Sequence, residues 1–249
     1  MTPEPMNPAE GPKGMGEAAR IPGIFFEPGK TFEDIARRPT WLTPMALVIA
    51  AVLIMLALFS QRVGWERGIR HQFETNPRLA QMDPAQREQA LQMQLRFAPV
   101  GSYVGVCIGV PLVDLLLAAI LLGIVKGFLS APVQFKQVFA VVTWGGLPGL
   151  ISTILAVVVM YLKPPDDFNL QNPLVFNPGA FMDPLTSSKF LYSLASSLDL
   201  FTIWVLVLVG MGLKAAGGRN LSMGGAMTAV FLPWAVWVLG KAALAGVFA

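Results

Sequence analysis

The sequence predicts an all-α integral membrane protein, a bundle of five transmembrane helices joined by short amphipathic connecting helices. Composition provides two indications, because hydrophobic residues make up 54% of the 249 residues and charged residues only 13%. A soluble domain carries about 25% charged residues, so this chain has too little polar surface for a water-exposed globule. The third indication is a series of five apolar runs, each close to the roughly 20 residues that a helix needs to cross the hydrocarbon core.

The predicted spans are rich in Leu, Val, Ile, Ala and Phe around their whole circumference, which is typical of a helix surrounded by lipid. Their expected bounds are 43–61, 99–125, 138–162, 190–213 and 223–245. A soluble protein with very hydrophobic core helices is the alternative, and the length of the runs makes it the weaker one. A β-barrel would show alternating segments of about 10 residues, and the sequence contains none.

The segment before the first span divides into two parts. Residues 1–23 are polar and rich in Pro, Gly and Glu, so we expect a disordered tail with no signal peptide, followed by a membrane domain over 24–249. Residues 24–38 carry a helical pattern with Thr31 as the expected N-cap. The side chains that would form its apolar face, in the membrane interface, are Phe25, Phe26, Phe32 and Ile35.

Two connections are long enough to carry structure of their own. In 62–98, the run Asp83-Pro84-Ala85-Gln86 combines an N-cap with a proline at the first helical position, and it predicts a short helix leading directly into the second span. This helix is either a docking surface or, as we favour, a connector that covers the outer mouth of the bundle. Residues 163–189 are rich in proline and are predicted to form a loop.

Lysine and arginine near the ends of the spans indicate the orientation. Three regions that would share one side of the membrane are basic, through Arg37 and Arg38, Lys126 and Lys136, and Lys214 and Arg219. We therefore expect the N-terminus in the cytoplasm and the C-terminus outside. The segment 62–97 argues against this orientation, because it carries more arginines than acidic residues.

Asp114 and Asp199 are the candidate functional residues, since each is the one charge in an otherwise apolar span. A charge at the bilayer centre costs about 2.5–3.5 kcal/mol, so it usually faces the bundle interior. Counted along the helices from Lys126 and Lys214, the two acids lie roughly 18 and 22 Å from the predicted cytoplasmic ends. In one hypothesis the two acids form a pair that handles protons or cations, with one carboxyl protonated. In the other, which we favour, they are structural acids that are hydrogen-bonded to neighbouring helices.

Small residues in the second span form a second candidate feature. Gly101, Gly105 and Gly109 are four residues apart, so they share one face of a helix and let another backbone approach closely. We favour packing within the monomer over dimerisation. Prolines at 111, 148 and 233 are expected to interrupt or kink three spans.

Local patterns along the chain also resemble those of a known family. They are Phe26-Glu27-Pro28 with Thr31-Phe32-Glu33-Asp34-Ile35 and Pro39-Thr40-Trp41; Met82-Asp83-Pro84-Ala85-Gln86-Arg87-Glu88; Phe135-Lys136-Gln137-Val138-Phe139 with Gly145, Gly146, Leu147 and Pro148; Ser197-Leu198-Asp199-Leu200-Phe201 with Trp204 and Gly212; and Ser222, Ala226 and Pro233. Over roughly residues 24–245 the chain resembles the prokaryotic branch of the Yip-domain family, named from Ypt/Rab-interacting proteins. The Asp-Leu-Phe-x-x-Trp pattern is the most specific part.

The resemblance implies a five-helix membrane fold with a cytoplasmic N-terminus, in agreement with the charges. It also implies that the protein lies in the cytoplasmic (inner) membrane of a prokaryote. It assigns family-motif positions to Pro28, Phe32, Phe135, Pro148, Phe201 and Trp204. Eukaryotic members act in vesicle trafficking with small GTPases, and that role is not carried over here. Prokaryotic members have no agreed biochemical function, so the resemblance implies a fold more than a mechanism.

No catalytic, cofactor-binding or metal-ligating residue is predicted. The single cysteine and the single histidine exclude a cysteine-built or multi-histidine metal centre, and the sequence matches no catalytic motif that we considered. A net charge of +3, spread along the chain, does not indicate nucleic-acid binding.

The leading hypothesis is a non-enzymatic membrane scaffold in membrane organisation or trafficking. Its partners would be the lipid bilayer, other membrane proteins or a second copy of the chain. The alternative is a small transporter or channel for protons or cations that uses Asp114 and Asp199. An intramembrane enzyme ranks last, because two acidic residues alone favour it.

Overall fold

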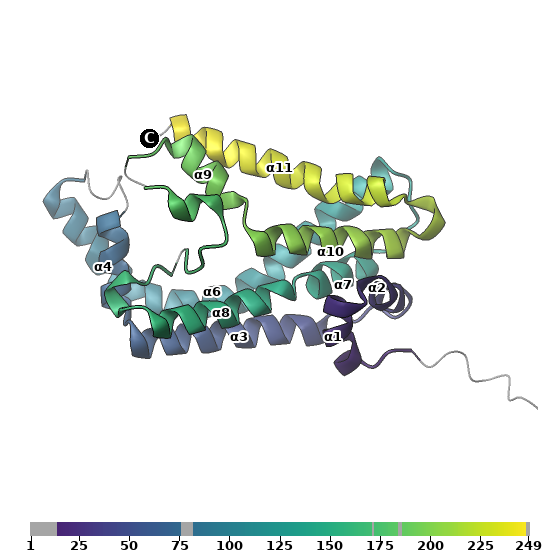
Figure 1. Ribbon diagram of the computed structural model, residues 1–249, viewed down its shortest axis with the longest axis horizontal. Coiled ribbons are helices and arrows are strands. Elements are labelled where there is room, and N and C mark those ends of the chain that lie inside the picture. The colour runs from purple at the N-terminus through teal and green to yellow at the C-terminus, as the bar shows by residue number, and fades with distance from the viewer. Residues whose placement is uncertain (1–13, 76–81, 171, 184–185, 248–249) are drawn as a thin grey trace, which may run out of the picture.

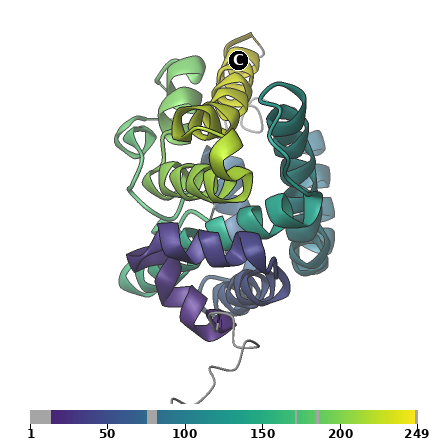
Figure 2. The same ribbon diagram turned by 90° about the vertical axis from the view of Figure 1, so that its right-hand side faces the viewer.

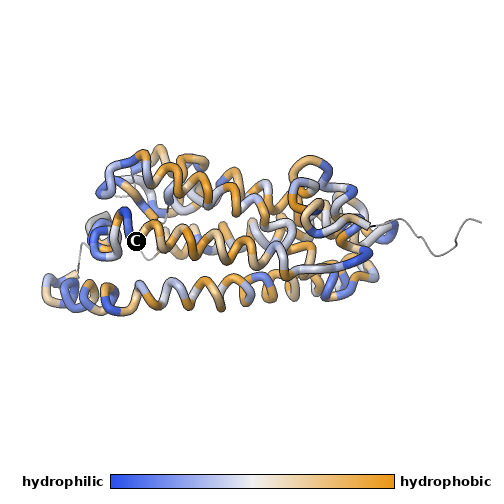
Figure 3. Tube along the Cα trace, turned by 90° about the horizontal axis from the view of Figure 1, so that it is seen from below, coloured by the Kyte–Doolittle hydropathy of each residue, from blue (hydrophilic) through white to orange (hydrophobic). Residues whose placement is uncertain are grey.

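The computed structural model describes residues 14–75, 82–170, 172–183 and 186–247. Long helices run side by side to form an elongated bundle (Figure 1). Within these ranges, five helical segments are long and apolar enough to cross a membrane, judged by length and composition. The all-α membrane class and the number of spans are therefore confirmed. Hydrophobic residues dominate the middle of the bundle and hydrophilic residues gather at both ends (Figure 3).

The spans are formed by six helices, because the third span is divided. These are α3 (Leu42–Arg62), α6 (Pro84–Gly127), α7 (Phe135–Gly145) with α8 (Pro148–Leu162), α10 (Leu200–Gly217) and α11 (Met223–Val247). Shorter helices lie outside them: α1 (Glu17–Phe26), α2 (Pro28–Arg37), α4 (Trp65–Thr75) and α9 (Lys189–Ser197), with 3-10 turns η1 (Pro165–Asp167), η2 (Pro178–Phe181) and η3 (Gly218–Asn220).

The bundle has two unlike ends. One end, which we call the α1–α2 end, holds these two helices and the loops α6–α7 and α10–α11 (Figure 1). Figure 2 looks at this end and shows α1 and α2, in purple, lying across it beside α7 and α10. The opposite end, the α4–α9 end, holds these helices and the connection 163–188.

The connection 62–98 is helical on both sides of residues 76–81, which lie outside the described ranges. The carboxyl of Asp83 accepts a hydrogen bond from the Ala85 N–H at 2.9 Å, and α6 then runs for 44 residues without a break into the second span. This confirms the predicted helix start. The side chains of Ile69 and Phe73 on α4 pack against Leu91 on α6, so the two helices form a hairpin beyond the spans.

Of the three predicted proline interruptions, one divides a span. Pro148 is the first residue of α8, where a missing N–H costs nothing, and Gly146 and Leu147 separate α8 from α7. Pro111 and Pro233 lie inside the continuous helices α6 and α11. The connection 163–189, predicted as a loop, contains only η1, η2 and the first residue of α9 among its described residues.

The fourth span differs from the expected 190–213. The structure divides this run into α9, which packs against α11, and α10, with a break at Leu198–Asp199. The physical reason is the carboxyl of Asp199, which accepts hydrogen bonds from the N–H groups of Phe201 and Thr202 at 3.0 and 3.1 Å. A side chain that caps a new helix occupies the N–H groups at its start, so the preceding helix ends there.

Three expectations about the N-terminal segment are wrong. Residues 1–13 of the expected tail lie outside the described ranges, but the tail does not extend to residue 23, because α1 begins at Glu17. Thr31 is not an N-cap: α2 begins at Pro28, and the Thr31 hydroxyl donates to the Glu27 carbonyl at 2.9 Å. Phe26 is 83% exposed and does not share the buried face of Phe32.

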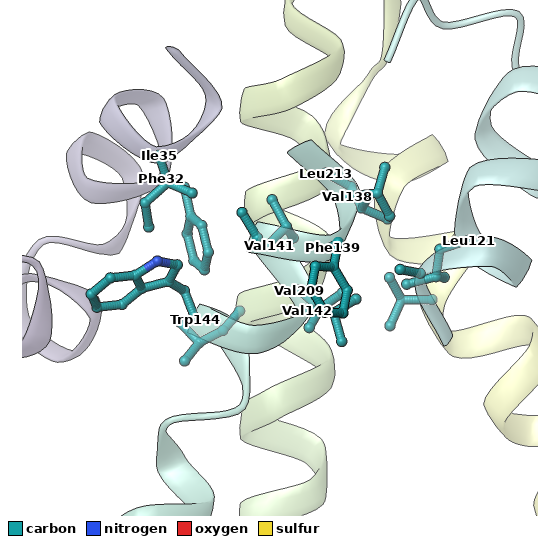
Figure 4. Close-up of a cluster of buried hydrophobic side chains, with 14 of the residues drawn as sticks. Phe32, Ile35, Leu121, Val138, Phe139, Val141, Val142, Trp144, Val209 and Leu213 are labelled. Atoms are coloured by element: carbon teal, nitrogen blue, oxygen red, sulfur yellow. The ribbon is translucent and has the colours of Figure 1, made fainter. Parts of the chain in front are cut away.

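The main hydrophobic core lies where α2, α7 and α10 meet (Figure 4). Side chains of Phe32 and Ile35 from α2 pack with the buried residues of α7 and α10, and Leu121 adds a contact from α6. The backbone of Gly212 permits this packing, because a Cβ there would lie 2.5 Å from Val141 Cγ1 and 2.8 Å from Phe32 Cδ1. An extramembrane helix is thereby joined directly to two spans.

Candidate functional site

The most elaborate polar cluster of the described residues lies at the α1–α2 end and is centred on Arg20. This side chain is 2% exposed. Its Nε donates to Asp34 Oδ2 at 2.9 Å, one terminal nitrogen donates to Thr40 Oγ1 at 2.8 Å, and the other donates to the Arg38 carbonyl at 3.1 Å. The guanidinium also lies over the Trp144 ring, 5.9 Å from its centre. One side chain therefore joins α1, α2, the start of α3 and α7. We call the five residues Arg20, Asp34, Arg38, Thr40 and Trp144 the Arg20 cluster.

Asp34 is the acid that balances this cluster. Besides Arg20, it forms an ion pair with Arg38 and accepts a hydrogen bond from the Met15 N–H at 3.2 Å. Burial raises the pKa of the Asp34 carboxyl, but the hydrogen bonds from Arg38 and Arg20 outweigh burial and hold the pKa below its usual value. The carboxyl is therefore charged at neutral pH.

A second acid ties α1 to the start of α3. Glu17 accepts a hydrogen bond from the Thr43 hydroxyl. Hydrogen bonds from Thr43 and Thr40 lower the pKa of the Glu17 carboxyl. Asp34 and Glu17 are thus held in the charged state by hydrogen-bond donors, some of which come from distant parts of the chain.

Two further hydrogen bonds connect α7 to the chain before the first span. Gln137 Nε2 donates to the Ala36 carbonyl at 2.9 Å, and Trp144 Nε1 donates to the Thr40 carbonyl at 2.8 Å. The partners are about a hundred positions apart in the sequence, so these bonds depend on the tertiary fold. Together with the Arg20 cluster they hold α1 and α2 in one fixed position on the bundle.

The motif positions implied by the resemblance begin helices or pack against other side chains. Pro28 begins α2, Phe32 is fully buried, and Pro148 begins α8. Phe135 stacks on Phe139 with ring centres 5.9 Å apart.

Phe201 and Trp204, at the start of α10, belong to a row of rings. The ring of Phe201 contacts Phe176 of the connection 163–188, with centres 5.6 Å apart, and stacks on Trp204 at 6.5 Å. Trp204 in turn meets Phe25 of α1 edge-on at 5.7 Å. This aromatic row runs from α1 to the connection at the opposite half of the bundle.

The structure places the two intramembrane acids in different settings and shows no interaction between them. Asp199 is the N-cap of α10. Asp114 is half-buried in the continuous helix α6, on the same helical face as the buried residues Ala118 and Leu121. Within the described ranges its carboxyl makes no hydrogen bond or ion pair.

The glycine stripe of α6 does not pack within the monomer, contrary to our expectation. A Cβ built on Gly101, Gly105 or Gly109 would meet no atom of the described residues within 4 Å. Close helix contacts occur instead at Gly212 and Gly145. A Cβ on Gly145 would lie 2.7 Å from Val209 Cγ2.

Sequence reasoning missed Arg20, the central residue of the cluster. It lies in a segment whose composition resembles a disordered tail, and no local pattern distinguishes it from an exposed arginine. Over the parts of the chain that the structure describes, no group of three or more His, Cys, Asp or Glu residues is arranged to hold a metal ion.

Comparison with known proteins gives one match. A family model described as Yip1 domain matches residues 23–244, from within α1 to near the end of α11. No curated protein and no solved structure matches the chain.

Proposed function

The chain belongs to the Yip1 domain family, and from this membership we propose that it is a non-enzymatic membrane scaffold that binds partner proteins through α1 and α2. The role would lie in membrane organisation or trafficking. One observation carries the proposal: a buried charged cluster fixes two extramembrane helices to the spans. Burying an ion pair seldom increases stability over an apolar pair, so fixing a defined geometry is a better reason for its presence.

The outward face of α2 is suited to contact with a protein. Near the start of the helix, Lys30 pairs with Glu27, and the exposed ring of Phe26 directly precedes them. Because the Arg20 cluster immobilises the helix, a partner would meet a surface that is already ordered, which lowers the entropy cost of binding.

Site-specific photocrosslinking in living cells tests this proposal. A photoreactive residue at Lys30, on the exposed face of α2, is expected to give a discrete protein adduct. Arg20→Met should weaken this adduct, because the change removes the partner of Asp34 and frees the adjoining helix α1. Gln89 on α6, also exposed, is the control position. If α2 gives only the adducts that Gln89 gives, α2 is not the binding surface. If Arg20→Met leaves the α2 adducts unchanged, the Arg20 cluster does not order that surface.

The orientation belongs to the same proposal. The loops α6–α7 and α10–α11 lie at the α1–α2 end, and the basic residues around them are those that predict a cytoplasmic side. We place the α1–α2 end in the cytoplasm and the C-terminus outside, in the inner membrane of a prokaryotic cell.

A transporter or channel for protons or cations is the second candidate, and one observation favours it. Asp114 is a half-buried carboxyl without a described partner in the apolar part of α6, and such residues commonly mark ion pathways. Proton or cation flux into vesicles containing the purified protein, lost in Asp114→Asn and Asp199→Asn, would support this function. Flux equal to that of empty vesicles would exclude it for the ions tested.

A further inference from the structure

Two loops adjoin at the α1–α2 end and bring basic residues of distant segments to one region. Leu129 of the α6–α7 loop and Leu221 of the α10–α11 loop belong to one hydrophobic cluster, and a Cβ on Gly225 would lie within 4 Å of both. The cations around these loops are Lys126, Lys136, Lys214 and Arg219.

These cations are not neutralised by acidic residues of their own segments. The sequence contains no Asp or Glu from 115 to 165 or from 200 to 249. Lys214 donates to the Gly218 carbonyl, and none of the four forms an ion pair with a described residue. The region is therefore available to a negatively charged ligand.

Helix stability explains two of these cations but not Lys136. Lys126 and Lys214 lie in the last turns of α6 and α10, where positive charge stabilises the helix dipole. Lys136 lies in the first turn of α7, where positive charge is unfavourable. The start of α7 is already capped by Gln134 and Gln137, so Lys136 does not replace a missing cap.

A groove of about 440 Å³ lies beside these residues, where α2, α7 and α10 meet. Its lining consists of Glu33, Ala36, Arg37, Gln137, Ala215 and Ala216. Lys136 and Lys214 are not among the lining residues, but each directly precedes one of them in the sequence, Gln137 and Ala215, so both lie at the edge of the groove. The one acid, Glu33, is 3.9 Å from Arg37, and both side chains are mostly exposed, so this weak pair leaves Arg37 available to an anion.

Exposed aromatic side chains place this region at the level of lipid headgroups. Phe128, directly after α6, is 83% exposed, and Phe135 at the start of α7 is also exposed. Phe128 and Phe135 lie within two residues of Lys126 and Lys136, so apolar surface and cations meet here, as they do where a membrane protein contacts anionic headgroups. A phospholipid can contact these rings with its acyl chains, whereas a soluble anion gains nothing from apolar contacts.

We propose that this groove binds the headgroup of an anionic phospholipid, with Arg37, Lys136 and Lys214 contacting the phosphate. The lipid belongs to the leaflet at the α1–α2 end, and its acyl chains lie along the adjoining spans. Among the lysines beside the groove, Lys136 is the one whose position helix stability does not explain, so it is the most informative one to change.

The test measures lipid binding to the purified, delipidated full chain in detergent, by native mass spectrometry during titration with phosphatidylglycerol or phosphatidylcholine. We expect preferential binding of phosphatidylglycerol. Lys136→Gln should weaken it about fivefold, the effect of one basic residue near an anionic surface. Lys163→Gln, which removes an exposed lysine at the opposite end, is the matched control and should have no effect. Lys136→Gln keeps a polar side chain at an exposed position and is expected to fold.

Three results would overturn the proposal. The first is equal binding of the two lipids by the wild-type chain. The second is a loss of binding in Lys163→Gln as large as in Lys136→Gln. The third is displacement of bound phosphatidylglycerol by millimolar inorganic phosphate, which would identify the groove as a site for a soluble anion. Lys30→Gln, near the start of α2 and outside the groove lining, should leave lipid binding unchanged, which separates this proposal from protein binding at the start of α2.

Discussion

Asp199 shows how one acidic residue can change the architecture of a span. Within a run of apolar residues, its carboxyl accepts hydrogen bonds from the first free N–H groups of α10, and the chain before it forms a separate short helix. Asp114, in a similarly apolar run, lies inside a continuous helix. The same residue type thus has two structural outcomes, and the positions of neighbouring backbone donors decide between them.

Two substitutions of Asp199 distinguish a role of its carboxyl in capping α10 from a role in proton handling. Asp199→Ala is expected to lower the free energy of unfolding by about 1 kcal/mol, because the N–H groups of Phe201 and Thr202 lose their acceptor. Asp199→Asn should have little effect, since the amide oxygen accepts the same bonds. Unfolding in detergent, followed by circular dichroism, measures both. Equal losses in the two variants would show that the charge matters rather than the cap.

The pKa of Asp34 predicts a pH dependence. Because hydrogen bonds from Arg38 and Arg20 hold this pKa below its usual value despite burial, the charged carboxyl stabilises the fold at all pH values above the usual pKa. That contribution is lost as the pH falls through the lowered pKa. The difference in melting temperature between the wild type and Asp34→Asn should therefore shrink between neutral pH and about pH 3. A constant difference would assign the effect to packing instead.

At the scale of elements, the Arg20 cluster determines whether α1 stays on the bundle. Arg20→Ala leaves Asp34 with only its bonds from Arg38 and Met15, in a buried place. Breaking a buried pair costs about 3–5 kcal/mol, and the remaining partners put the expected loss near the lower limit. Hydrogen exchange of α1 amides should rise sharply while that of α11 stays unchanged. Lys30→Ala, which breaks the exposed pair with Glu27, is the control.

The glycines of the spans belong to two classes that the structure distinguishes. Gly212→Val should destabilise the contact of α10 with α7 and α2 by about 1–3 kcal/mol, since the new side chain would overlap Val141 and Phe32. Gly105→Ala meets no atom within 4 Å and should be tolerated. Melting temperatures of the two variants in detergent provide the comparison. A loss in Gly105→Ala would indicate that another molecule covers the α6 stripe.

At the scale of the whole molecule, the two ends differ in how they are closed. The α1–α2 end is covered by helices joined to the core through buried charge and aromatic packing. At the α4–α9 end, α10 does not extend as far along the bundle as the neighbouring spans. The connection 163–188 and α9 lie beyond its start (Figure 1). Non-helical backbone at such depth is tolerated where protein surrounds it, as for Leu174 packed against Phe201.

The orientation of the whole bundle is testable with two cysteines in a Cys107→Ala background. Lys30→Cys lies at the α1–α2 end and Lys163→Cys at the other, and both positions are exposed. A membrane-impermeant maleimide added to intact prokaryotic cells, with an outer membrane made permeable where one exists, should label Lys163→Cys alone. Opening the inner membrane should allow both to react. Labelling of Lys30→Cys alone in cells with a closed inner membrane would reverse the proposed topology.

Some features of this protein follow from its sequence because they depend on local properties. The spans follow from the length of apolar runs, the start of α6 from the Asp83-Pro84 signature, and the start of α8 from Pro148. In each case the deciding interaction joins residues a few positions apart or joins the side chains to lipid. The family, too, followed from local patterns that the family match over 23–244 confirms.

The tertiary structure alone decided the rest, because those features depend on groups far apart in the chain. Arg20 is buried only because Asp34, Thr40 and Trp144 surround it, so its own polar segment could not reveal its position. The free face of Gly105 and the crowded one of Gly212 have the same local chemistry and differ only in which helix passes by. Apolar length determines that a segment enters the membrane, whereas three-dimensional neighbours determine what each residue does there.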